Sequence, residues 1–159
     1  MASIAKAAFL SRLRTEEYVV DGRSIPREFV LLEPLVYGHT DGTIHVAPKG
    51  FVCDFASIPK ILRNVFETND ETRAPAAMHD WLHCAQYTTR AYADDIFKAA
   101  MECRHSPWAK RQAMWSGVRA GGWVAWNAKA KTGLVQGYDM VDESYWDPWP
   151  SEASGAYHA

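Results

Sequence analysis

The feature that most limits the fold is a change in the spacing of apolar residues near position 70. Up to about residue 55, runs rich in β-branched and aromatic residues are interrupted by Asp-Gly dipeptides at 21–22 and 41–42. Asp-Gly favours the positive φ angles of tight hairpin turns. Pro34 and Pro48 each remove a backbone donor and therefore belong at strand ends or edges. This half of the chain predicts antiparallel strands.

The second half has helical spacing, and its capping residues predict where each helix begins. Asp70 or Thr72 can cap a helix over residues 75–87, and Thr88 or Thr89 can cap a second over 90–104. A third helix is expected over residues 107–126, opened by Ser106 and Pro107. Strands followed by helices predict an α+β fold, with N-terminal antiparallel β-hairpins followed by a bundle of about three helices.

The length of 159 residues fits one compact domain. We expect a single α+β domain over residues 15–140, preceded by an N-terminal arm or short amphipathic helix over 1–14. An aromatic C-terminal tail is expected over 141–159, and its Tyr145, Trp146 and Trp149 are predicted to dock on a partner. A short tail cannot easily bury three such side chains on its own domain.

Composition excludes several classes of protein. The net charge of -2 gives no strong nucleic-acid signal, and no apolar run approaches the roughly 20 residues of a transmembrane segment. The 3 cysteines suit reduced thiols better than a disulfide framework. Synthesis in a host cytoplasm is the expected setting.

For other side chains on the third predicted helix, the sequence predicts only whether they are buried or exposed. Trp115, Trp123 and Trp126 are expected in the core, because aromatic side chains bury large areas. Lys110, Arg111 and Arg119 are expected on a solvated helix face.

The candidate site lies on the first two helices. His79 and His83 are one helical turn apart and share a face, which Asp80 partly shares. If the second helix returns antiparallel, Asp94 can reach His79, and a carboxylate bonded to one ring nitrogen prepares the other as a general base. His79 and Asp94 are therefore the predicted catalytic pair. Asp54, at a strand exit, is a further candidate metal ligand or a partner of this pair.

Several spaced blocks resemble an uncharacterised protein family found mainly in tailed bacteriophages and prophages. The blocks are Gly50-Phe51-x-x-Asp54-Phe55-Ala56-Ser57-Ile58-Pro59, then His79-Asp80-x-Leu82, then Arg90-x-x-Ala93-Asp94-x-x-Phe97, and they extend over about residues 27–122. The resemblance implies a phage origin, a location in the virion, and partners among other phage proteins or copies of the chain itself.

A more local stretch is similar to phospholipase A2 of the parvoviral type. There a His-Asp pair on one helix is followed by Ala-Asp-x-x-Phe on the next, as at His79-Asp80 and Ala93-Asp94 here. The similarity implies that His79 activates water, Asp80 binds calcium and Asp94 supports His79. The chain departs from that class in lacking its Gly-rich calcium loop and in having His83 where tyrosine is usual.

Two functions and one structural interpretation remain open on the sequence alone. The first function is a virion-associated structural or assembly component of a phage tail or head-to-tail connection. The second is a metal-assisted hydrolase, phospholipase-like or cell-wall-directed, with His79 as base and Asp80, His83 and Asp54 holding zinc or calcium. Only the phospholipase-like form would contact a membrane. The structural interpretation is a buried polar network that pins the two helices together.

Overall fold

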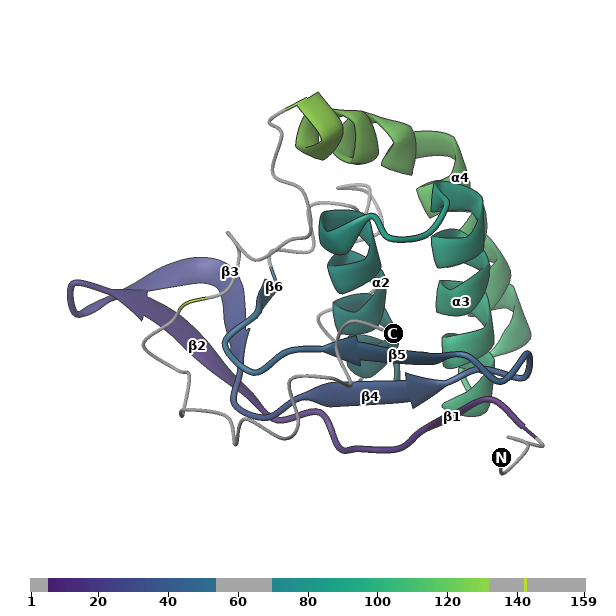
Figure 1. The fold of residues 1–159 in the computed structure, drawn as a ribbon, viewed down its shortest axis with the longest axis horizontal. Helices are drawn as coiled ribbons and strands as arrows, with labels where there is room; N and C mark the ends of the chain where they lie inside the picture. The colour runs from purple at the N-terminus through teal and green to yellow at the C-terminus, as the bar shows by residue number, and fades with distance from the viewer. Residues whose placement is uncertain (1–5, 54–69, 132–141, 143–159) are drawn as a thin grey trace.

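The computed structural model describes residues 6–53, 70–131 and 142, and its elements follow the predicted order of strands and then helices (Figure 1). The strands are β1 (Ala8–Phe9), β2 (Thr15–Val20), β3 (Arg23–Leu31), β4 (Leu35–Gly38), β5 (Ile44–Ala47) and β6 (Val52–Cys53). A 3-10 turn, η1 (Asp70–Thr72), leads into α2 (Arg73–Ala85), α3 (Arg90–Cys103) and α4 (Trp108–Lys131). The fold is α+β, as predicted.

The strands form two small antiparallel sheets, with orders β1-β4-β5 and β2-β3-β6. The β2–β3 hairpin turns at Asp21 and Gly22, whose φ angles of 49° and 74° are both positive. The β4–β5 hairpin pairs Gly38 with Ile44, and Gly42 in its loop has φ 88°. Both predicted Asp-Gly turns are confirmed, because the twist of a hairpin requires these left-handed conformations.

The short helix considered for the N-terminal arm is wrong for its described part. Ala8 and Phe9 form β1, which pairs with Gly38 and Tyr37 of β4. The Phe9 ring lies 5.1 Å from the Tyr37 ring, centroid to centroid. A helix of this length is marginal in water, so pairing with an existing strand and packing against Tyr37 outweigh the local helical pattern.

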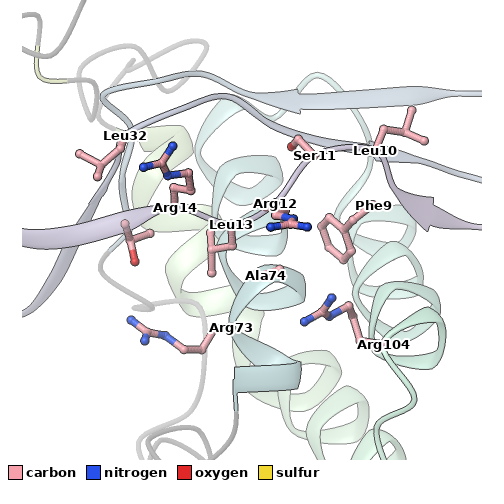
Figure 2. A pocket seen from close by; sticks show the side chains of 11 residues that line it. Phe9, Leu10, Ser11, Arg12, Leu13, Arg14, Leu32, Arg73, Ala74 and Arg104 are labelled. Carbon is pink, nitrogen blue, oxygen red and sulfur yellow. The ribbon is translucent and has the colours of Figure 1, made fainter.

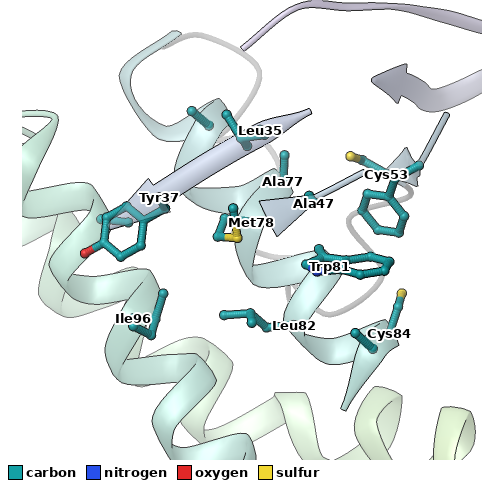
Figure 3. Close-up of a cluster of buried hydrophobic side chains, with 14 of the residues drawn as sticks. Leu35, Tyr37, Ala47, Cys53, Ala77, Met78, Trp81, Leu82, Cys84 and Ile96 are labelled. Atoms are coloured by element: carbon teal, nitrogen blue, oxygen red, sulfur yellow. The ribbon is translucent and has the colours of Figure 1, made fainter. Parts of the chain in front are cut away.

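Helix α2 is the centre of the molecule, and all of its 13 residues except Arg73 are buried. One face packs on the sheets, where Phe51 meets Trp81 edge to face at 5.2 Å and Met78 and Leu82 join the same cluster (Figure 3). A second cluster, formed by Ala76, Phe97, Met101, Met114 and Val118, joins α2 to α3 and α4. A polar side chain on α2 must therefore find its partners inside the protein.

Helix α4 departs from the prediction for its tryptophans. Trp126 packs against the core and Trp115 is half-buried, but Trp123 is 55% exposed. The core prediction is wrong for Trp123, because Met114 and Val118 form the face of α4 that is buried. Within the part of the chain that the structure describes, no helix is long and apolar enough to cross a membrane.

Helix α3 begins at a capped end that allows a direct test of the fold. The Thr89 side chain accepts a hydrogen bond from the backbone N–H of Tyr92 at 3.2 Å. Thr89→Ala leaves that donor without its cap, and we expect a loss of about 1 kcal/mol in the free energy of unfolding. Urea denaturation measures it, with Thr88→Ala as the control at the position before the cap. Equal effects of the two substitutions would contradict the assignment of Thr89 as the N-cap of α3.

Candidate active site

Three polar residues of α2 are fully buried, and this burial follows from the central position of the helix. His79, Asp80 and His83 are each 0% exposed. The connection over residues 86–89 reverses the chain, so that α3 lies beside α2 (Figure 1). Gln86 opens this connection in the left-handed conformation, with φ 48°. The reversal brings Asp94, in the second turn of α3, against the polar residues of α2.

Both imidazoles contact one carboxylate oxygen, Oδ1 of Asp94. His79 Nε2 lies 2.8 Å from Asp94 Oδ1, and His83 Nε2 lies 3.3 Å from the same oxygen. The two imidazole rings are stacked at a tilt, with centroids 4.1 Å apart. The structure thus forms the contact between His79 and Asp94 that the helical spacing predicted, and it adds His83 to the same acceptor.

Two arginines hold the other oxygen of Asp94. Arg90, one turn earlier on α3, places Nη1 3.1 Å from Oδ2, and Arg119 of α4 places Nη1 3.7 Å from it. Arg90 also donates to the backbone oxygen of Arg119 at 3.2 Å, which fixes α4 against α3. Arg119 is thus not only part of a solvated face, as expected, because the packing of α4 turns it toward Asp94. Spacing could have revealed Arg90, which stands four residues before Asp94.

These contacts keep Asp94 ionised inside the protein. Burial on its own would raise the pKa of the Asp94 carboxyl, but the hydrogen bonds and charges of His79 and His83 outweigh burial and hold that pKa well below its usual range. An ionised carboxylate only accepts hydrogen bonds. The nitrogen of each imidazole that faces Oδ1 therefore carries the proton.

The same residues are also a set of potential metal ligands. One ligand atom each from His79, His83 and Asp94 lies within 4.8 Å of the others. Two ligands about 2.05 Å from a tetrahedral zinc ion are about 3.3 Å apart. The His83–Asp94 contact matches that spacing, whereas the 2.8 Å His79–Asp94 contact is a hydrogen-bond distance.

The charges around Asp94 distinguish a hydrogen-bonded His-Asp dyad from a metal centre. Arg90 and Arg119 already place two positive charges beside the single negative charge of Asp94. A divalent cation at Oδ1 would add two more in surroundings that screen charge poorly. The geometry and the charge balance both fit a hydrogen-bonded His-Asp dyad better than a metal centre.

The other residues predicted to bind metal are not brought to this cluster. Asp80 is fully buried but is absent from the group of potential ligands found among the described residues. On a helix it points away from the direction of its neighbour His79 by about 100°. Asp54 lies outside the described residues.

The predicted docking residues Tyr145, Trp146 and Trp149 also lie outside the described residues. Of the predicted tail only Asp142 is described, and it contacts the strand half of the protein. Its backbone N–H donates to Gly50 at 2.9 Å, and the Tyr18 hydroxyl donates to its carboxylate at 3.0 Å.

Comparison with known proteins places the chain in a family. A family model described as a protein of unknown function, DUF1353, matches residues 29–118. The chain belongs to this family. The matched region extends from β3 into α4 and includes all three members of the His79-His83-Asp94 cluster. No curated protein and no solved structure matches the chain. Membership in an uncharacterised family, predicted from the sequence blocks, is confirmed.

Acid should weaken the fold through Asp94. Because its folded-state pKa is lowered, its contribution to stability is present above the unfolded-state value near about pH 4 and is lost as the pH falls toward the folded-state value. Asp94→Asn removes this titration. We therefore expect the stability difference between wild type and Asp94→Asn to shrink from pH 6 to pH 3 in urea denaturation. A constant difference would show that Asp94 does not titrate in this way.

Proposed function

We propose that this member of the DUF1353 family is a hydrolase in which His79 is the general base and Asp94 orients it. The observation that carries the proposal is the 2.8 Å contact between His79 Nε2 and Asp94 Oδ1, both fully buried. A carboxylate that fixes one nitrogen of an imidazole leaves the other nitrogen as the proton acceptor.

The chemistry follows from the protonation of the pair. With Nε2 protonated toward Asp94, we propose that a local opening brings water to Nδ1 of His79, which takes a proton from it as the water oxygen attacks the substrate. The resulting imidazolium is stabilised by the ionised Asp94, and its proton then passes to the leaving group. His83 approaches the same Asp94 oxygen at the longer distance of 3.3 Å, and the proposal therefore gives His79 the role of base and His83 that of holding the carboxylate in place.

The phospholipase-like form of the proposal draws support from the contact between His79 and Asp94, and His83 is its departure from that class. In the resembled class a tyrosine usually stands at this position, and here His83 contacts the aspartate that supports the catalytic histidine. The proposed substrates are phospholipid esters, with peptidoglycan as the alternative class. Asp80 remains the proposed cation-binding residue, for which calcium or zinc would serve to polarise the substrate.

Access to the base is a necessary part of the proposal. The imidazole of His79 is 0% exposed, so water and substrate reach it only after a local opening of the protein. We therefore expect slow modification of His79 by diethyl pyrocarbonate in the free protein and faster modification in the presence of a substrate that opens the site.

The experiment that tests the proposal is hydrolysis by the purified full chain, with elemental analysis of the same sample. Fluorescent phospholipid vesicles and labelled peptidoglycan are the substrates, each with added calcium, with added zinc and with a chelator. Turnover of either substrate supports the proposal, and lack of turnover under all conditions overturns it. A stoichiometric transition metal that is lost together from His79→Gln and His83→Gln would favour the metal centre over the dyad.

The virion location implied by the phage resemblance stays a separate proposal. It rests on the phage resemblance of the sequence blocks, and it is tested by mass spectrometry of purified particles. Absence of the chain from particles would place the proposed hydrolase in the infected cell.

A further inference from the structure

A second candidate site lies at the start of α2, apart from the histidine cluster. A cavity of about 950 Å³, open to solvent, lies between the segment that follows β1, the first turn of α2 and the residue that ends α3 (Figure 2). Its lining includes four arginines, Arg12, Arg14, Arg73 and Arg104. No Asp or Glu is among the described residues that line it. Arginines from three separate parts of the chain therefore surround one cavity.

Two of these arginines are already engaged. Arg14 pairs with Glu33 at 2.7 Å, and Arg73 places its guanidinium carbon 4.8 Å from the centre of the Phe29 ring. The stacking of Arg73 holds its side chain in place but leaves its positive charge uncompensated. Arg14 is balanced by its partner acid, so it contributes little to the field in the cavity.

The other two arginines differ from Arg14 in the described part of the chain. Arg12 and Arg104 form no ion pair with any residue in the described ranges 6–53, 70–131 and 142. Figure 2 shows Arg12 on the segment after β1 and Arg104 at the end of α3, with Phe9 beside them. Like charges repel, so a bound anion would offset the repulsion among the guanidinium groups of Arg12, Arg73 and Arg104, of which Arg12 and Arg104 are exposed to water that screens part of it.

The remaining lining defines the kind of anion. Phe9, Leu10 and Leu13 contribute apolar surface beside the arginines, and the volume lies within the range of small-molecule sites. A guanidinium fork matches the oxygens of phosphate and can bind two of them at once. The first turn of α2 adds the positive end of a helix dipole to the same wall.

We propose that this cavity binds a phosphate ester that carries an apolar group, with the phosphate held by Arg12 and Arg104. Arg73 supplies additional positive charge, and Phe9 and the leucines contact the apolar part. This site does not depend on the hydrolase proposal. The shared chemistry could come from a nucleotide or from a phospholipid headgroup, and the arms of the test separate these two sources.

The test is isothermal titration calorimetry of the full chain at low ionic strength with three probes. Inorganic pyrophosphate tests the phosphate site alone, a nucleoside diphosphate tests the nucleotide, and short-chain phosphatidic acid tests the lipid. We expect the dissociation constant of the preferred ester to rise about tenfold or more in Arg12→Ala/Arg104→Ala, because the double variant loses the charge-assisted hydrogen bonds of both guanidinium groups.

Matched variants keep the outcome interpretable. Arg23→Ala removes an exposed arginine of β3 that does not line the cavity, and it should leave binding unchanged. Arg12→Lys/Arg104→Lys keeps the charge but loses the planar fork, so it should weaken binding by a smaller factor even if the alanine variant fails to fold. Failure of all three probes to bind, or equal binding by the wild type and both double variants, overturns the proposal. Tighter binding of the nucleotide or of the lipid identifies the source.

Discussion

Asp94→Ala is expected to lower the free energy of unfolding by about 3–5 kcal/mol, the largest effect on stability that we predict. The substitution removes the acceptor of His79 and His83 in a fully buried position and leaves Arg90 without its partner. Arg90 is 28% exposed and can turn toward water, so most of the loss comes from the two imidazoles. Each has a polar N–H that solvent does not reach in the folded protein.

Equilibrium urea denaturation at neutral pH measures this loss, and the neighbouring residue provides the control. Asp95 is exposed and accepts a hydrogen bond from Trp115 Nε1 at 3.1 Å. Asp95→Ala removes the same chemical group from the same helix and should cost less than about 1 kcal/mol. If the two substitutions had the same effect, Asp94 would not be the buried centre of a network.

His79→Gln is expected to reduce kcat by about 10²- to 10⁴-fold on the substrate that the wild type hydrolyses, the usual contribution of a general base. The glutamine amide can still donate to Asp94, so the contact between α2 and α3 is retained. It cannot take a proton from water. The prediction therefore separates chemistry from packing, because activity falls far more than the free energy of unfolding does.

His83→Gln is the matched control for this prediction. It removes an imidazole from the same helix, and that imidazole contacts the same acceptor, Asp94 Oδ1. The proposed mechanism gives His83 no proton to carry. We expect a loss of kcat of about tenfold or less, measured alongside the pH dependence of the rate. An unaltered rate in His79→Gln would refute the general base, and equal large losses in both variants would point to a shared metal ion.

Those parts of the fold that depend on local sequence were predictable. The positive φ angles at Asp21 and Gly22 are a property of the dipeptide, and Thr89 caps α3 by bonding to a backbone group three residues away. The strand β1 was not predictable in the same way. It exists because Ala8 and Phe9 meet residues of β4 about thirty positions later, and no local pattern encodes that pairing.

In the candidate site too, contacts set by local sequence were predictable and contacts set by tertiary packing were not. The contact of His79 with Asp94 required only helical spacing and a short reversal between neighbouring helices. The position of Arg119 depends on how α4 packs across α3, a property of the assembled core. Among the described residues, His83 joins His79 and Asp94 in the group of potential ligands, and Asp80 is not in that group.

Because α2 has almost no exposed face, the surroundings of His79 and His83 depend on the elements that pack around this helix. Asp94 and Phe97 of α3 and Trp126 of α4 contact its imidazoles, and Arg119, one of the two cations near the acid, also comes from α4. A chain still being synthesised, or cut before that helix, would present the same histidines to bulk water. The buried surroundings of the contact between His79 and Asp94 would then form only when α4 has packed against α3.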